Sequence, residues 1–106
     1  MTQEQKSSQI ATTTKTEIAE PKKWKVIFHN DDFTPMDFVV YVLKAIFFKT
    51  DALAEDLMMK VHLKGKATVG EYPYDIALSK VNRTHRIARE NNYPLKLTMA
   101  PVRSRT

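Results

Sequence analysis

The sequence contains no cysteine, only two glycines and no long apolar run. Without cysteine it can form neither a disulfide scaffold nor a thiolate metal site, and it has no thiol nucleophile. Two glycines are too few for the glycine-rich loops that cradle phosphates. No apolar stretch approaches the roughly 20 residues that cross a membrane, and the polar N-terminus lacks the apolar core of a secretory signal. We therefore expect a non-enzymatic cytoplasmic protein with no metal, no cofactor and no membrane anchor.

The length and the charge of the chain indicate one small domain with a polar tail. Of its 106 residues, 17 are Lys or Arg and 12 are Asp or Glu, which gives a formal net charge of +5. This charge permits acidic partners but does not identify one. Residues 1–22 are rich in Thr, Gln, Ser, Lys and Glu, so we expect them to form a disordered N-terminal extension. Residues 23–106 then form the folded domain.

The folded part opens with a strand, a polar turn and a helix of unusual composition. Residues 23–29 alternate between polar and apolar side chains with the period of a half-buried strand. Thr34 is a good N-cap, Pro35 suits the first helical position and Asp37 can complete a capping box, so a helix should begin here. From there to about Lys49 the side chains are apolar nearly all round the helix.

Two further helices and two further strands follow. The predicted segments are a helix from residue 50 or 51 to 64, a strand over 67–71, a helix to about 91 and a strand over 95–99. We expect the second helix to bury a stripe that includes Leu53, and the third helix to bury Ile76, Ala77, Val81, Thr84, Ile87 and Ala88. The order β-α-α-β-α-β predicts an α+β fold in which a three-stranded antiparallel sheet packs on three helices.

The apolar helix is too hydrophobic to be only a structural element of so small a domain. A chain of this size has no deep interior, so one face of the helix should pack on the sheet while another lines an apolar groove. Asn30, Asp31 and Asp32 would lie at the mouth of that groove. Such a groove suits a ligand with a cationic head and an apolar body. The alternative is that these three residues only end a strand and precede a helix.

A second function class is a small nucleic-acid-binding module. It is suggested by the net charge and by a basic stripe on the third helix, formed by Lys80, Arg83, Arg86 and Arg89. Stacking platforms for bases need exposed aromatic side chains between the basic ones, and the aromatic residues gather on the first helix instead. The stripe is more typical of a solvated helix face.

A third function class is a metallohydrolase. His29, Asp31, Asp32 and His62 carry imidazole and carboxylate groups that suit zinc or manganese. This alternative requires all four side chains to converge on one point of the fold.

Three blocks of the sequence resemble the ClpS family, the adaptors of the Clp unfoldase–protease machine. The blocks are NDDFTPMDFVV over residues 30–40, MMKVHLKGKA over residues 58–67 and ARENNYPL over residues 88–95. The resemblance implies the same α/β sandwich of three strands and three helices. It also implies a monomeric adaptor that binds substrate proteins and a ClpA-type AAA+ unfoldase, with no role in nucleic-acid binding.

The resemblance assigns a binding role to particular residues. Family members recognise a bulky hydrophobic N-terminal residue with a free α-amino group, and by match to the family Asn30, Asp31 and His62 would bind that amine. The apolar pocket for the first side chain would be formed by Thr34, Met36, Val39, Met58, Val61 and Leu95. Asp75 and Lys80 match positions of the surface that docks on the unfoldase. The N-terminal extension resembles the one that family members need to hand over their substrates.

Overall fold

The structure, a computed structural model, describes residues 22–103. The expected disordered extension therefore lies, apart from residue 22, outside the described residues. The elements follow the predicted order β-α-α-β-α-β, which confirms the α+β fold class. They are β1 (Lys23–His29), α1 (Met36–Ala45), α2 (Asp51–Lys64), β2 (Lys66–Pro73), α3 (Tyr74–Glu90) and β3 (Lys96–Pro101).

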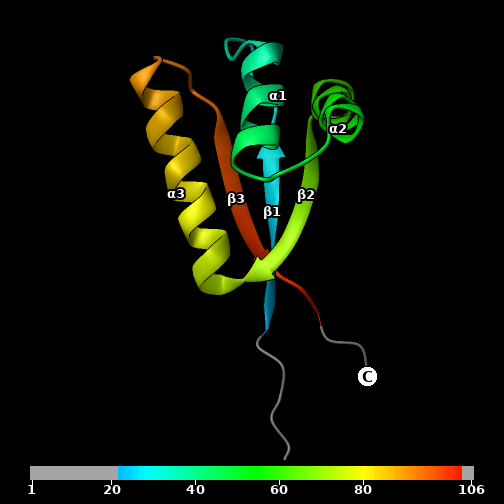
Figure 1. The fold of residues 1–106 in the computed structure, drawn as a ribbon, viewed down its shortest axis with the longest axis vertical. Helices are drawn as coiled ribbons and strands as arrows, with labels where there is room; N and C mark the ends of the chain where they lie inside the picture. Colours follow the sequence, from blue (N-terminus) through cyan, green and yellow to red (C-terminus); the bar gives the residue numbers. More distant parts are fainter. Residues whose placement is uncertain (1–21, 104–106) are drawn as a thin grey trace, which may run out of the picture.

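The three strands form one antiparallel sheet in the order β2-β1-β3, and the helices cover one of its faces (Figure 1). The central strand β1 explains this arrangement, because its side chains alternate between the two faces. Val26 and Phe28 point toward the helices and are fully buried. On the other face, His29 lies opposite Lys66 of β2 and Lys96 of β3.

Helix α1 begins and ends differently from the prediction. Pro35 occupies the N-cap position with extended backbone angles and no side-chain cap, so the expected capping of the helix by Thr34 and Asp37 is wrong. The helix stops at Ala45 rather than near Lys49, and Phe48 takes the left-handed conformation that usually ends a helix. The correct start is displaced by only a residue or two, but the early stop changes what the following residues do.

Helix α2 has the predicted bounds for the predicted reasons. The Thr50 side chain accepts a hydrogen bond from the backbone N–H of Leu53, and Gly65 ends the helix with a φ of 88°. Only Ala54, Met58 and Val61 of this helix are buried, so the expectation that Leu53 packs in the core is wrong. Leu53 lies in the first turn of the helix and is 43% exposed.

Helix α3 buries four of the six residues predicted for its seam, namely Ala77, Val81, Thr84 and Ala88. Ile76 is 48% exposed, which corrects the prediction for that residue. The core is completed by β1 and by the buried face of α1, where Val39, Val42 and Leu43 lie. Among the described residues, no helix has both the length and the apolar character needed to cross a bilayer.

Candidate binding site

The turn between β1 and α1 is organised by the carboxylate of Asp31. One of its oxygens accepts hydrogen bonds from the backbone N–H groups of Phe33 (2.8 Å) and Thr34 (2.7 Å), and the other accepts from the Thr34 hydroxyl (2.8 Å). This is the local pattern by which Asp holds a tight turn. Thr34 therefore acts on Asp31 and not on the helix. The backbone N–H of Asn30 also donates to the carbonyl of Gly65 (2.9 Å), which ties the turn to the end of α2.

A cavity of about 240 Å³ opens between this turn, the start of α1 and the side of α2. Its walls are apolar: Val39, Met58 and Val61 are buried in the core, and Met36 stands half-exposed at the start of α1. The volume exceeds the roughly 150 Å³ of a cavity that takes a benzene ring. It therefore has room for one large side chain and is smaller than a typical drug-sized site.

The polar groups of the cavity come from two elements. They come from the turn, as Asn30, Asp31, Asp32 and Thr34, and from the last turns of α2, as His62. Burial alone would raise the pKa of Asp31, but the hydrogen bonds from Thr34 and Phe33 outweigh it, so its pKa is lowered. The carboxylate is thus held ionised and in a fixed orientation. The opening of the apolar cavity carries a negative charge and several hydrogen-bond acceptors.

The structure brings together eight of the nine residues that the sequence analysis proposed for this site. Those that line the cavity are Asn30, Asp31, Thr34, Met36, Val39, Met58, Val61 and His62. Leu95 does not line it: its side chain is 1% exposed and belongs to the core. Asp32 does line it, as expected for a residue at the mouth of the groove, although the family resemblance gave it no binding role. The signal for Asp32 was its place beside Asp31 in a turn that faces the groove.

His29 lies apart from the cavity, on the face of the sheet that the helices leave uncovered. Its Nε2 is 2.7 Å from the hydroxyl of Thr98 in β3. Burial and the neighbouring Lys96 and Lys66 lower the pKa of His29. Within residues 22–103, no three His, Asp or Glu side chains are placed to hold one metal ion. The four residues of the metallohydrolase alternative do not converge, so that interpretation is wrong.

The basic stripe of α3 is divided by the fold. The Lys80 ammonium donates to the carbonyl of Ile46 (2.7 Å), and the Arg89 guanidinium donates to the carbonyls of Tyr93 (2.8 Å) and Leu95 (2.9 Å). Of the four stripe residues, Arg83 and Arg86 are exposed and make no such bond to a backbone carbonyl within residues 22–103. The stripe is therefore interrupted, which weakens one of the two observations behind the nucleic-acid alternative and leaves the net charge as the other.

The fold and the cavity together define the class: a small α+β domain that presents an apolar pocket with an acidic mouth. Residues 19–98 match the family model described as ATP-dependent Clp protease adaptor protein ClpS. The ATP-dependent Clp protease adapter protein ClpS of Clostridium acetobutylicum is 48% identical over 83% of this chain and 87% of its own. The corresponding protein of Desulfotalea psychrophila is 41% identical over 93% of this chain and 97% of its own.

A solved structure shows the same fold. The structure of Agrobacterium tumefaciens ClpS2 bound to L-phenylalaninamide superimposes with a TM-score of 0.75 and 37% sequence identity. It covers 78% of this chain and 100% of the other. The chain therefore belongs to the ClpS family. It is an adaptor of the ATP-dependent Clp protease and not an enzyme, which implies an AAA+ unfoldase and substrate proteins as its partners.

Proposed function

We propose that this adaptor binds proteins that begin with a bulky hydrophobic residue, Leu, Phe, Tyr or Trp, and delivers them to a ClpA-type unfoldase in the cytoplasm. The observation that carries the proposal is the cavity itself, because apolar walls and an ionised carboxylate meet at one opening. An N-terminal residue of this kind has the same two parts, a large apolar side chain and a cationic amine. The adaptor acts as a monomer, with no role for nucleic acid, membrane or cofactor.

The apolar walls account for selection by size. Full burial of a Leu or Phe side chain contributes about 1.5–3 kcal/mol to binding. Burial of an Ala side chain contributes little, and burial of a charged side chain is unfavourable. Met36 and Met58 line the pocket from α1 and α2. Their unbranched, polarisable side chains can adjust to both aliphatic and aromatic guests. This supports a pocket that accepts several large residues rather than one.

The polar groups of the cavity account for selection of a free amine. A protonated α-amine has three donors and no acceptor, so it needs acceptors that converge from different directions. Asn30 and Asp31 offer oxygens from the turn, and His62, in its neutral form, offers a ring nitrogen from α2. Acetylation removes the charge and two of the three donors. Charge-assisted hydrogen bonds contribute about 1.5–3 kcal/mol each, so an acetylated N-terminus should bind poorly.

The ligand of the related Agrobacterium protein supports this assignment. L-phenylalaninamide carries a free α-amine, a benzyl side chain and an amide in the place where a polypeptide would continue. It therefore has the chemistry of a phenylalanine at the start of a chain. At 37% identity across the whole of that protein, the same chemistry is a reasonable expectation for the pocket of this chain.

For delivery, we propose that Asp75 and Lys80 belong to the surface that docks on the unfoldase. Asp75 is exposed in the first turn of α3. Lys80 is partly buried, and its ammonium is bound to the carbonyl of Ile46. A partner would therefore contact mainly the exposed side of the Lys80 side chain. Both residues lie on α3, away from the cavity between α1 and α2.

Fluorescence anisotropy with matched peptides tests the proposal. The peptides begin with Leu, Phe, Val, Arg and acetyl-Leu and are otherwise identical. We expect the free Leu and Phe peptides to bind at least about 100-fold more tightly than acetyl-Leu, since two charge-assisted bonds correspond to some 3 kcal/mol or more. The Arg peptide controls for attraction by charge alone. Equal binding of Leu and acetyl-Leu, or of Leu and Arg, would refute the assignment of the cavity.

A further inference from the structure

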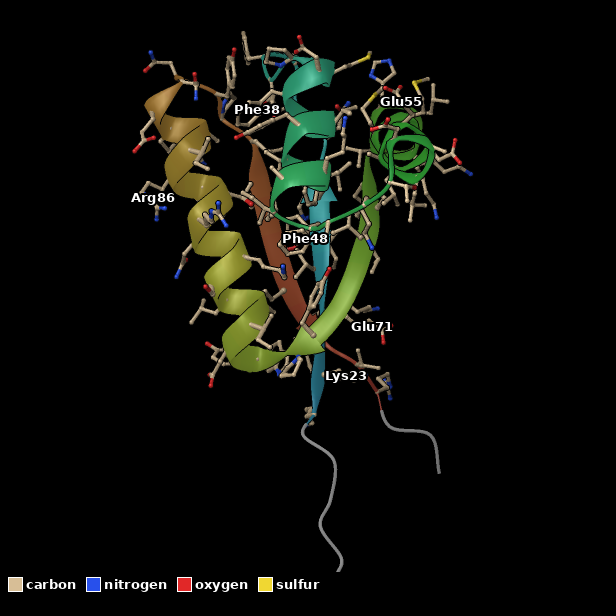
Figure 2. The ribbon with its side chains drawn as sticks, viewed as in Figure 1. Lys23, Phe38, Phe48, Glu55, Glu71 and Arg86 are labelled. Atoms are coloured by element: carbon tan, nitrogen blue, oxygen red, sulfur yellow. The ribbon has the colours of Figure 1, made fainter. Side chains whose placement is uncertain are left out.

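Phe48, between α1 and α2, has a backbone conformation that its side chain disfavours. Its φ is 56°, in the left-handed region. A residue with a bulky side chain is an uncommon occupant of that region, because the Cβ atom crowds the following carbonyl. Its ring is 76% exposed, so the fold gains little from burying it. Figure 2 shows Phe48 at the end of α1, on the side of the molecule flanked by α3 and β2.

The neighbouring hydrogen bonds explain how this conformation is held. The backbone N–H of Lys49 donates to the carbonyl of Leu43 (3.0 Å) and that of Phe47 to the carbonyl of Val42 (3.4 Å), so the chain around Phe48 is bonded back to the last turn of α1. The Lys80 ammonium closes the same end of α1 by donating to the carbonyl of Ile46 (2.7 Å). Phe48 thus occupies a position where glycine would be less strained. Burial therefore does not explain why a phenylalanine, and not a glycine, occupies this position.

The surroundings of Phe48 are cationic. The Lys80 nitrogen lies 4.6 Å from the centre of the Phe48 ring and 5.4 Å from that of Tyr72. Burial lowers the pKa of Lys80, and so do the nearby positive charges of Arg83 and Lys49. Ile76, 48% exposed, precedes Lys80 by one helical turn and lies on the same face of α3. The result is an exposed aromatic ring beside the ammonium of Lys80, with the positive charges of Lys49 and Arg83 near that ammonium.

We propose that Phe48 is the apolar anchor with which this adaptor docks on its unfoldase, and that it enters an apolar socket rimmed by carboxylates. The inference rests on the proposed function and adds to it the anchor residue and the chemistry of the partner's site. Large aromatic side chains with a polar rim around them provide most of the energy of many protein interfaces. The cations around Phe48 select an acidic partner and speed the encounter.

The position of Phe48 favours the unfoldase over the other possible occupants. The substrate pocket lies at the opposite end of α1, about 15 Å away along a helix of ten residues, so both partners can be bound together. A second copy of the chain would bring the same cations to the contact, and they would repel each other. Single-stranded nucleic acid needs several exposed rings for stacking, but the neighbouring Phe47 is buried.

Substitution of Phe48 by glycine separates docking from folding. Phe48→Gly relieves the backbone strain, so its thermal unfolding midpoint should equal or exceed that of the native chain. Its affinity for the complete ClpA-type hexamer, measured by anisotropy of the labelled adaptor, should fall at least about tenfold, as for a hot-spot residue. Its affinity for the free Leu peptide should not change. Leu63→Ala, which removes another exposed apolar side chain (71% exposed) on α2, is the matched control and should dock normally.

The outcomes distinguish this inference from the proposed function. Failure of the native chain to bind the Leu peptide refutes the proposed function alone. Equal docking by the native chain and Phe48→Gly, no docking by either, or a clear fall in the unfolding midpoint of Phe48→Gly overturns the inference. If the native chain sediments as a dimer and the variant does not, the ring binds a second copy of the chain and the inference is overturned. If a single-stranded oligonucleotide binds only when Phe48 is present, the ring binds nucleic acid and the inference is also overturned.

Discussion

The two ends of helix α1 are both held by a charged side chain from outside the helix, but in opposite ways. At the start, the carboxylate of Asp31 orders the turn that precedes Met36. At the other end, the ammonium of Lys80 binds the carbonyl of Ile46. Each charge has the sign that complements the helix dipole at its end. The first end satisfies its polar groups locally and leaves an apolar hollow, while the second leaves an aromatic ring exposed.

With the roles proposed for its two ends, one short helix serves two partners. Asp31 accepts hydrogen bonds from residues two and three positions away, so the turn is ordered mainly by local bonds. Lys80 is 34 residues from Ile46, so the far end of the helix is ordered only when α3 has packed. The start of α1, which is ordered locally, suits recognition of a small chemical group. The far end of α1 forms only in the folded domain, and this suits a contact with a large partner.

The largest expected effect concerns the start of α1. Asp31→Ala removes the negative charge from the cavity and also the acceptor for three hydrogen bonds of the turn. We expect the affinity for a free Leu peptide to fall about 100-fold or more, since charged hydrogen bonds contribute about 1.5–3 kcal/mol each. Anisotropy titration of the native and variant chains measures it. Asp37→Ala, an exposed carboxylate in the first turn of α1, serves as the control and should bind within a factor of two. An Asp31→Ala variant that binds as well as this control would contradict the role of the carboxylate.

The next largest effect concerns the C-terminal end of α1 and the free energy of unfolding. Lys80→Met removes the hydrogen bond to Ile46 and the contact of the ammonium with three aromatic rings, those of Phe47, Phe48 and Tyr72. Because such a bond involves a charged donor, we expect the free energy of unfolding to fall by about 2 kcal/mol. Urea denaturation provides the measurement. The fall should not be accompanied by any loss of affinity for the Leu peptide.

A second lysine near the same end is the matched control. Lys44 pairs with Asp51 at 2.7 Å, but the two side chains are 47% and 85% exposed. Exposed ion pairs contribute little to stability, because water and salt screen them. Lys44→Met should therefore change stability far less than Lys80→Met does. Equal losses in the two variants would mean that general charge removal, and not the bond to Ile46, holds this end of the helix.

The sequence predicts the region around the start of α1 better than the region around its far end. The order of elements and the bounds of α2 were predictable, since alternation, Thr50 and Gly65 are local signals. The residues that line the cavity were predictable because they lie in two blocks, residues 30–40 and 58–67, that resemble one family. The role of Thr34 was misread. A threonine before a proline has the sequence pattern of a helix cap, yet its hydroxyl binds a carboxylate three residues earlier.

The far end of α1 could not be predicted from the sequence. Residues 46–48 continue the apolar pattern of the helix, so periodicity alone extends the helix through them to about Lys49. What stops it is the left-handed conformation of Phe48, which no local signal favours, together with a hydrogen bond from Lys80 on a distant helix. The sequence presented Lys80 as part of a solvated stripe. Only the packing of α3 against the α1–α2 connection turns it inward.

A smaller effect tests whether the hydroxyl of Thr34 helps to position the Asp31 carboxylate in the turn. Thr34→Val keeps the shape of the side chain but removes the donor to Asp31, so the carboxylate is held by the backbone N–H groups alone. A hydrogen bond of this kind contributes about 1 kcal/mol, which corresponds to a roughly fivefold loss of affinity for the Leu peptide. Thr34→Ser should restore the affinity, because it restores the hydroxyl. A serine variant as weak as the valine variant would assign the effect to the lost methyl group and the pocket wall.

The smallest effect is the acid dependence of stability at the start of α1. Hydrogen bonds from Thr34 and Phe33 lower the pKa of Asp31 in the folded chain despite its partial burial. Below the unfolded value of about 3.9, the unfolded state therefore binds more protons than the native state, and stability falls as the pH falls toward the lowered pKa. Asp31→Asn cannot titrate, so its unfolding free energy should change less between pH 5 and pH 3 than that of the native chain. Lys80→Met should keep the native slope, since a lysine does not titrate there. If Asp31→Asn kept the native slope as well, the acid dependence would have to come from other carboxylates, and the turn would not be held by an ionised Asp31.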